Sequence, residues 1–463
     1  MKPLGQKELP EPLSFRALLG PSFILLGLGL GSGELILWPY LVAHWGLGII
    51  WGAILGIIFQ FFLNMEIERY ALVTGESVFV GLARKLGKIM PLWFLLSTLV
   101  PWIWPGIAAV SGKIFANLFN FPDSNVVTII LLFSIGVILT LGPTLYHTVE
   151  KLQKGLILIG VPLVFGLAVF LAGPLDWQAL FSGIVGIGDG YRFLPNNIAI
   201  ASFLAAFAYS GAGGNLNLAQ AFYVKEKGYG MGKYSGKITS ILTGKAETIA
   251  LEGNTFEINQ SNLSFFRQWW KAINLEHLIV FGLTGIFTIL MLALLAHTTL
   301  YQHRIIPSGV GFLILEKEII GQMTLPIVGS VFFILVGLML FATQLTVFDA
   351  TSRIMAENLA ILSNKHFPIS NLSRYFYVVL WAQIILGVIV LSLGISEPLK
   401  LLTIGAVLNA AAMFVSIGLT CYLNITSLHV VLRPSLWRLA ILLTAFLFFG
   451  GFTLSNLLTL LVN

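Results

Sequence analysis

The sequence predicts an all-α membrane protein, and three observations support this fold class. Of the 463 residues, 57% are hydrophobic and only 10% are charged, whereas soluble domains carry about 25% charged residues. Eleven apolar stretches are long enough to cross a bilayer as helices. Two of them carry a glycine-rich polar stretch in their middle. The lipid bilayer is therefore the expected solvent, and the net charge of +6 is not taken to indicate a nucleic-acid partner.

We number the predicted spans 1 to 11 in chain order. They cover residues 16–43, 47–72, 90–119, 125–143, 152–173, 198–222, 276–301, 327–361, 375–395, 398–423 and 435–461. In this arrangement most of the 26 lysines and arginines lie in loops on the side of the N-terminus. The excess of basic residues predicts a cytoplasmic N-terminus and, after an odd number of spans, an external C-terminus in a bacterial-type plasma membrane.

The first interrupted span contains the stretch Gly27–Pro39, which reads GLGLGSGELILWP. Its glycines and the carboxyl group of Glu34 are costly inside lipid unless the irregular stretch lines a cavity. Glu34 is the acid most expected to contact a cation, a proton or an amine. The alternative is a neutral carboxyl bonded to a backbone group, or one paired with a basic residue.

A second interrupted span follows about 180 residues later, with the stretch Phe207–Asn217, FAYSGAGGNLN. Interrupted helices at corresponding places in two halves of a chain are typical of transporter binding sites. For either stretch alone, tight helix packing through small residues is an alternative explanation. The pair predicts a binding site made of Gly31, Ser32, Gly33, Glu34, Ser210, Gly211, Gly213, Gly214 and Asn215. Gln344 and Asn409, polar residues within apolar spans, are candidate cavity residues or interhelical hydrogen-bond partners.

Span 3 contains PWIWP at Pro101–Pro105, where two prolines predict a kinked or broken helix. The division predicted for the chain is a cytoplasmic N-terminal segment (1–15), the first repeat with helix 6 (16–223), a cytoplasmic loop insertion (224–275) and helices 7 to 11 (276–463). Within the insertion, alternation from Glu247 to Ile258 predicts a small hairpin. Phe265–Ile273 predicts an interfacial helix.

Three stretches resemble one family of membrane proteins. Gly31–Trp51, GSGELILWPYLVAHWGLGIIW, is similar in pattern to the first-helix region of Nramp metal transporters. Glu68–Ser77, ERYALVTGES, resembles the end of that family's second helix, and NLNLAQA, from Asn215, resembles its sixth. The resemblance covers nearly the whole chain apart from Lys225–Asn274. It implies the LeuT-type fold, with two inverted five-helix repeats, an eleventh helix, and broken helices 1 and 6.

The family's metal ligands are absent from the matching positions. Its aspartate falls on Gly31, its asparagine on Glu34, its methionine on Ala212, its histidines on Gly214 and Ala219, its helix 3 acids on Gly106 and Ala109, and its helix 10 glutamines on Ala406 and Asn409. The resemblance thereby adds Ala212 to the predicted site and leaves Glu34 as the only candidate metal-binding acid.

The resemblance implies a secondary transporter that works by alternating access, and the departures from the family's ligands favour one class of substrate. Manganese and iron sites favour soft or imidazole ligands, whereas one carboxylate with amide and backbone oxygens suits a hydrated, magnesium-like divalent cation. The alternatives are a small organic solute, or a transport-inactive receptor or structural protein of the same fold. The sequence predicts no enzyme activity and no cofactor. It leaves open the coupling ion, the direction of transport, the role of the 224–275 loop and the oligomeric state.

Overall fold

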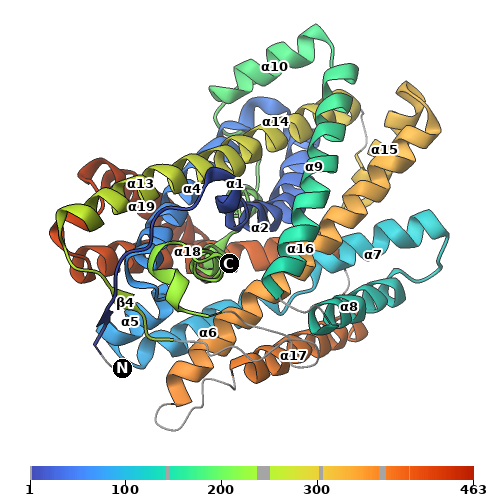
Figure 1. The fold of residues 1–463 in the computed structure, drawn as a ribbon. Helices are drawn as coiled ribbons and strands as arrows, with labels where there is room; N and C mark the ends of the chain where they lie inside the picture. Colours follow the sequence, from blue (N-terminus) through green and yellow to red (C-terminus); the bar gives the residue numbers. More distant parts are fainter. Residues whose placement is uncertain are drawn as a thin grey trace.

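The computed structural model describes residues 3–141, 145–236, 251–301, 306–363, 372–395 and 397–462, with side chains as far as Ser455. Helices dominate this part of the chain (Figure 1). Ten helical stretches in it are long and apolar enough to cross a membrane. They coincide with ten of the eleven predicted spans. The remaining one, span 6, is interrupted and is too short on either side of the interruption to meet that length.

The helices of spans 1 to 5 come first. Their bounds are α1 Phe15–Leu18, α2 Pro21–Gly29, η1 Leu30–Leu37, α3 Trp38–Trp45, η2 Leu47–Ile49, α4 Trp51–Thr74, α5 Val78–Leu86, α6 Ile89–Trp102, α7 Gly106–Phe119, α8 Ser124–Leu141, α9 Leu145–Leu171 and α10 Pro174–Ile184. Span 3 is divided between α6 and α7 at the predicted proline-containing stretch, because Pro105 precedes α7 and cannot continue a helical hydrogen-bond ladder. A short hairpin, β2 Ile187–Gly188 with β3 Tyr191–Arg192, follows α10.

The second part of the chain contains spans 6 to 11. Its elements are α11 Ile200–Ala208, η3 Gly214–Ala219, α12 Gln220–Lys227, η4 Gly230–Tyr234, β4 Asn254–Thr255, α13 Gln260–His277, η5 Leu278–Leu283, α14 Thr284–Ala296, η6 His297–Tyr301, α15 Gly311–Met323, α16 Pro326–Ser363, α17 Leu372–Ser392, α18 Pro398–Ser427, η8 Val430–Leu432 and α19 Leu436–Val462. Helices α10 and α15 lie at the end of the bundle away from the N-terminus (Figure 1).

The N-terminal segment is attached to the predicted loop insertion. Strand β1, Gly5–Gln6, pairs in parallel with β4. This pairing differs from the predicted local hairpin, part of which falls on residues 247–250, outside the described residues. The predicted stretch Phe265–Ile273 is helical as part of α13, whose Trp269 indole donates a hydrogen bond of 2.8 Å to the Pro10 carbonyl. Helix α13 continues into α14 (Figure 1), so the insertion ends in a helix that belongs to span 7.

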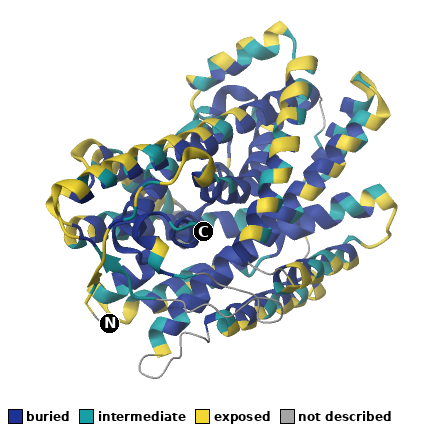
Figure 2. Cartoon of the chain, viewed as in Figure 1, coloured by how far each residue is buried: buried dark blue, intermediate teal, exposed yellow. Residues whose placement is uncertain are grey.

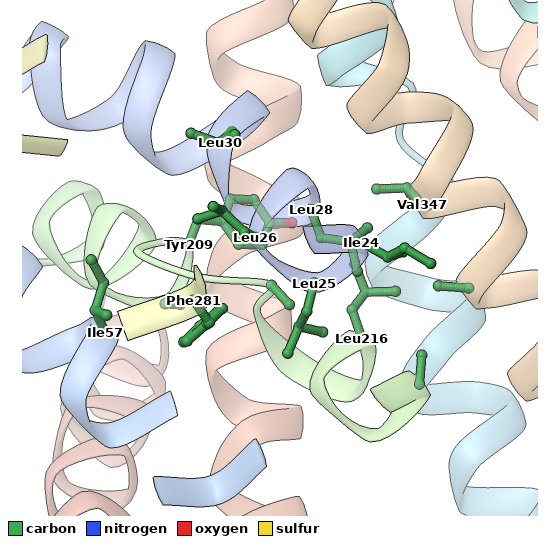
Figure 3. Packing of buried hydrophobic residues seen from close by; sticks show 14 of the residues in the cluster. Ile24, Leu25, Leu26, Leu28, Leu30, Ile57, Tyr209, Leu216, Phe281 and Val347 are labelled. Carbon is green, nitrogen blue, oxygen red and sulfur yellow. The ribbon is translucent and has the colours of Figure 1, made fainter. Parts of the chain in front are cut away.

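The distribution of buried and exposed residues is that expected of a protein surrounded by lipid. The centre of the bundle is buried, and exposed positions concentrate on the outer helices (Figure 2). Many exposed residues there are large hydrophobic ones, for example Ile130, Leu158 and Leu447. A surface of this kind is stable in a hydrocarbon environment and would aggregate in water. In the core, side chains of span 1 pack against Tyr209, Phe281 and Val347 (Figure 3).

Candidate functional site

Span 6 is interrupted where the sequence predicts. Helix α11 ends at Ala208, and regular structure resumes with the 3-10 helix at Gly214. Gly213 and Gly214 have φ angles of 78° and 53°. This left-handed region is accessible to glycine at little cost and strained for other residues. The two glycines therefore allow the chain to leave the helix inside the bundle.

Gln60 of α4 satisfies the backbone groups that this interruption releases. Its amide Nε2 donates to the Ala208 carbonyl at 3.2 Å, and its Oε1 accepts from the Gly213 N–H at 3.0 Å. An unpaired backbone group within a membrane costs several kcal/mol, so this fully buried glutamine stabilises the break. We did not identify Gln60 from the sequence. The available signal was an amide in the apolar run of span 2.

Span 1 differs from the expected broken helix. Its glycine-rich stretch, Leu30–Leu37, is a π-helix that continues from α2 into α3. The backbone N–H of Trp38 donates to the Gly33 carbonyl five residues earlier, so backbone hydrogen bonding continues within the helix. The irregularity lies where the sequence predicts, but the expectation of an unwound stretch is corrected to a widened helical turn. Such π-bulges are frequent at functional sites.

Glycines bring the two irregular stretches into direct contact. A β-carbon placed on Gly33 would lie 1.7 Å from the Tyr209 carbonyl oxygen, and one on Gly29 would lie 2.9 Å from the Gly211 Cα. Gly31 faces span 8 instead, where Thr343 donates to the Gly27 carbonyl at 2.8 Å. Small residues therefore permit close helix packing here. The glycine-rich stretches thus serve close packing and also include an interrupted helix. Tight packing and a binding site, the two explanations considered for these stretches, are therefore compatible.

Glu34 is buried beside this contact, with 1% of its surface exposed. Its Oε2 has no hydrogen-bond partner among the described residues. Its Oε1 lies 3.7 Å from the β-carbon position of Gly285 in α14, so the carboxyl group lies against span 7. A buried acid with an unpaired oxygen has the chemistry needed to receive a cation or a donor.

Two polar residues of span 6 are held by protein partners. Ser210 accepts a 2.9 Å bond from the Trp38 indole and donates to the Ala206 carbonyl at 3.1 Å. The Asn215 amide donates to Ser97 and Thr98, at 2.8 and 3.0 Å, while its Oδ1 accepts from Ser416 at 2.8 Å. These bonds fix the two ends of the interruption to neighbouring spans.

Gln344 and Asn409, the two polar candidates from later spans, have contacts in different parts of the bundle. Gln344 Oε1 accepts from the Ala108 N–H at 3.2 Å, near the start of α7, where backbone donors lack partners within the helix. Asn409 donates to the Tyr209 hydroxyl at 2.9 Å, and its Oδ1 has no partner among the described residues. Of the two, Asn409 thus lies against the interruption in span 6.

All twelve predicted site residues are buried: Gly31, Ser32, Gly33, Glu34, Ser210, Gly211, Ala212, Gly213, Gly214, Asn215, Gln344 and Asn409. The site is therefore closed to solvent in this conformation. Within the described ranges, no group of three or more histidine, cysteine or acidic side chains is placed to hold a metal ion.

The arrangement of the spans defines the class of fold. It is the LeuT-type fold of two inverted five-helix repeats with an eleventh helix. No protein-family model matches the chain, and the search of curated proteins found no match.

Similar solved structures are found among membrane transporters. A manganese transporter of Eremococcus coleocola, in mutant form, has a TM-score of 0.69 at 14% sequence identity, covering 98% of this chain and 89% of its own. A complex of that transporter with an aromatic bis-isothiourea compound has a TM-score of 0.67 at 13% identity over the same shares. Mhp1, a nucleobase-cation-symport-1 family transporter with bromovinylhydantoin bound, has a TM-score of 0.53 at 14% identity over 99% of this chain and 94% of its own. At these identities the likeness establishes the fold.

Proposed function

We propose that this protein is a secondary transporter that moves a hydrated, magnesium-like divalent cation across the membrane by alternating access. The observation that carries the proposal is the contact between the interrupted span 6 and the π-helical stretch of span 1, beside the unpaired Glu34 oxygen. The manganese transporter of the same fold supports transport of a cation. We also propose, from the distribution of lysines and arginines, that the face carrying the N-terminus is cytoplasmic.

The chemistry of the site supports a hard cation. Glu34, which lies against span 7, supplies one carboxylate, and Asn409 supplies an unpaired amide oxygen at the interruption of span 6. Magnesium binds through one or two carboxylates while retaining several waters. Soft-metal selectivity would require thiolate, thioether or imidazole ligands, but the matching positions carry Ala212 and Gly214. We therefore do not propose manganese or iron as substrates.

The burial of the site supports alternating access. With all twelve site residues buried, a hydrated ion enters only after segments separate on one side. The close contacts of Gly29 and Gly33 with span 6 are where such a separation would occur. In alternating access the protein exchanges between two conformations. A substrate shifts their populations only to the extent that its affinity for the two conformations differs.

Glu34→Gln tests the proposal. The glutamine keeps the size of the side chain and removes its charge, so magnesium affinity should fall by about tenfold or more, or about 1.4 kcal/mol per tenfold. The measurements are binding isotherms and uptake into sealed proteoliposomes, at two pH values. Wild-type binding should also weaken at the lower pH, since protonation removes the charge of Glu34.

Glu316→Gln is the matched control, because Glu316 is a buried acid of α15 outside the predicted site. It should leave magnesium affinity unchanged. Equal affinity in wild type and Glu34→Gln would reject the cation proposal. An absence of magnesium and organic-solute uptake by a folded wild type would favour the transport-inactive alternative.

One observation favours a small organic solute as a second candidate. The Tyr209 ring stacks on Trp102 with centroids 5.6 Å apart, beside Asn409. The Trp102 Nε1 and the Asn409 Oδ1 both lack partners among the described residues. An aromatic pair with a free donor and a free acceptor is suited to a planar solute. Asn409→Leu should then abolish binding of that solute, whereas Glu34→Gln should change it little.

A further inference from the structure

A second group of buried polar side chains lies nearer the N-terminal face. Ser22 of α2, Glu68 of α4, Gln220 of α12, and Glu276 and His277 of α13 form this group, which we call the Glu68–His277 cluster. Each is at most 1% exposed. The cluster therefore joins spans 1, 2, 6 and 7, the spans that also surround the proposed substrate site.

The contacts form a chain from Glu68 to Glu276. The His277 Nδ1 lies 3.5 Å from Glu68 Oε1 and 2.8 Å from the Ser22 hydroxyl oxygen. The Ser22 hydroxyl in turn donates to Glu276. Gln220 donates to Glu68 Oε1 at 2.8 Å. An imidazole and a hydroxyl thus connect two buried carboxyl groups on different helices.

The cluster has unused hydrogen-bonding capacity. Four of its buried atoms have no partner among the described residues: Glu68 Oε2, Glu276 Oε1, His277 Nε2 and Gln220 Oε1. Each such atom costs about 1–3 kcal/mol in a folded protein. Buried unsatisfied groups are few in native structures, so four within one cluster require an explanation. A structural role alone would be met by apolar residues at lower cost.

The charged neighbours of the cluster are bonded to other acids. Arg438 of α19 acts electrostatically on Glu68 and His277, but its Nε donates to Glu66 at 2.6 Å. Lys154 and Lys227 act electrostatically on Glu276, but both bond to Glu150 Oε1, at 2.7 and 3.0 Å. Two buried carboxyls therefore share the cluster with no ion pair to a lysine or arginine among the described residues.

Aromatic side chains also lie around the cluster. Phe61 and Phe281 stack against the His277 imidazole, with centroids 5.4 and 4.8 Å away. Tyr146 and Tyr229 lie within electrostatic range of Glu276, and the Tyr229 hydroxyl donates to the Leu18 carbonyl. The apolar rings exclude water from the imidazole, which disfavours its charged form and leaves protonation of the two acids as the main way to change the charge of the cluster.

We propose that the Glu68–His277 cluster binds and relays the proton that is coupled to transport. The 2.8 Å contact between Nδ1 and Ser22 corresponds to hydrogen on Nδ1, because the single Ser22 proton is donated to Glu276. His277 reaches this state from the tautomer with hydrogen on Nε2 when its Nδ1 takes the proton of the Glu68 carboxyl and forms a transient imidazolium. Nδ1 then passes this proton to the Ser22 oxygen while the Ser22 hydroxyl releases its own proton to Glu276. One proton moves from Glu68 to Glu276, and Ser22 and His277 return to their starting states.

The geometry requires one small movement for this relay. The distance of 3.5 Å between Glu68 and His277 must shorten to about 3 Å to form a hydrogen bond. The helices that carry these residues meet at the cluster, so a shift of span 1 or 7 would make or break the chain. Transfer is therefore expected in one transport conformation and not in the other.

The chain leads from the protein interior toward the proposed cytoplasmic face. Glu68 lies eight residues after Gln60 in the same helix, about 12 Å along its axis, and Gln60 supports the interruption in span 6. At the other end, Gly20 contacts Glu276 and lies beside Glu150 and Lys227, and Lys227 is partly exposed. Glu276 is thus placed to release a proton to this face.

The first test measures proton binding without a substrate. Infrared difference spectra record the protonated carboxyl band between about pH 5 and pH 9, a range that covers raised carboxyl pKa values. Because burial raises the pKa of Glu316 to about 8, all measurements use the Glu316→Gln background. A titrating band should be present and should lose intensity in both Glu68→Gln and Glu276→Gln. A band unchanged over this range, or unaffected by both substitutions, would overturn the proposal.

Ser22→Ala provides a test that keeps both acids. It removes the hydroxyl between His277 and Glu276, so the carboxyl band should remain while the two acids titrate independently. If Ser22→Ala left the coupled titration as it is in the parent protein, the relay through Ser22 would be rejected. Thermal unfolding in detergent establishes that each variant is folded.

The second test concerns coupling, which rests on the proposed function. In proteoliposomes, one unit of pH difference should change magnesium accumulation by about tenfold for one coupled proton. Ser22→Ala should lose this dependence while still exchanging magnesium without a gradient. Equal pH dependence in Ser22→Ala and its parent would reject the coupling role. If the parent takes up no magnesium, the proposed substrate fails, and the infrared titration alone still decides whether the cluster binds protons.

Discussion

The two glycine-rich stretches of spans 1 and 6 look alike in sequence and differ in structure. Leu30–Leu37 remains helical as a π-helix, whereas the chain leaves the helix between Ala208 and Gly214. The difference lies in the backbone angles. Gly213 and Gly214 have positive φ angles, but the glycines of span 1 are helical and serve close packing. Glycine content thus indicates irregularity without specifying which form it takes.

The partners of the backbone explain why only one stretch opens. In span 6, Gln60 pairs with a carbonyl and an N–H that the interruption leaves free. The π-helical turn in span 1 pairs its own groups, so it needs no equivalent side chain. A break inside a membrane protein therefore requires both residues that permit it and a neighbouring helix that satisfies it.

Among the variants that test this difference between the two stretches, Gln60→Leu should have the largest effect on stability. It leaves the Gly213 N–H and the Ala208 carbonyl without their partner, at about 1–3 kcal/mol for each group. We expect a marked loss in the free energy of unfolding in detergent and a loss of substrate binding. Asn64→Leu is the control, one turn further along α4, since the buried Asn64 amide has no partner among the described residues. That variant should be neutral or more stable. Equal stability of both variants would contradict the role of Gln60.

Gly33→Ala should have the next largest effect, because it acts on the contact between the two stretches. The new methyl group would meet the Tyr209 carbonyl oxygen at 1.7 Å, and overpacking of this kind costs about 1–3 kcal/mol. The measurement is thermal unfolding together with substrate affinity.

The control for this substitution is Gly166→Ala in α9, where the new methyl group would meet no atom of a packed neighbour within 4 Å. Alanine should stabilise this exposed helical position by about 0.5–1 kcal/mol. A Gly33→Ala variant as stable as wild type would show that the two stretches separate readily.

Trp38→Phe should have the smallest effect. It removes the indole N–H that bonds to Ser210 and ties the end of the π-helix to span 6. A hydrogen bond of this type contributes about 0.5–1.5 kcal/mol. Trp93→Phe is the control, because the Trp93 Nε1 has no partner among the described residues. Similar losses in both variants would mean that ring size, and not the bond to Ser210, determines the effect.

The amino-acid sequence is sufficient to predict the lipid environment, the spans and the positions of both irregular stretches. Apolar runs of sufficient length and paired glycine-rich stretches with Glu34 are local properties, and local properties can be read along the chain. Ten of the predicted spans and the interruption of the remaining one followed from them.

Which side chains contact one another depends on how the helices pack, and this could not be predicted from the sequence. The pairing of Gln60 with span 6, the contact of Asn409 with Tyr209, and the chain from Glu68 through His277 to Glu276 join residues distant in sequence. In a lone apolar span, a polar residue has the same sequence signature whether it caps a backbone, binds a substrate or holds a proton. Its role depends on which helix lies opposite, and packing determines that.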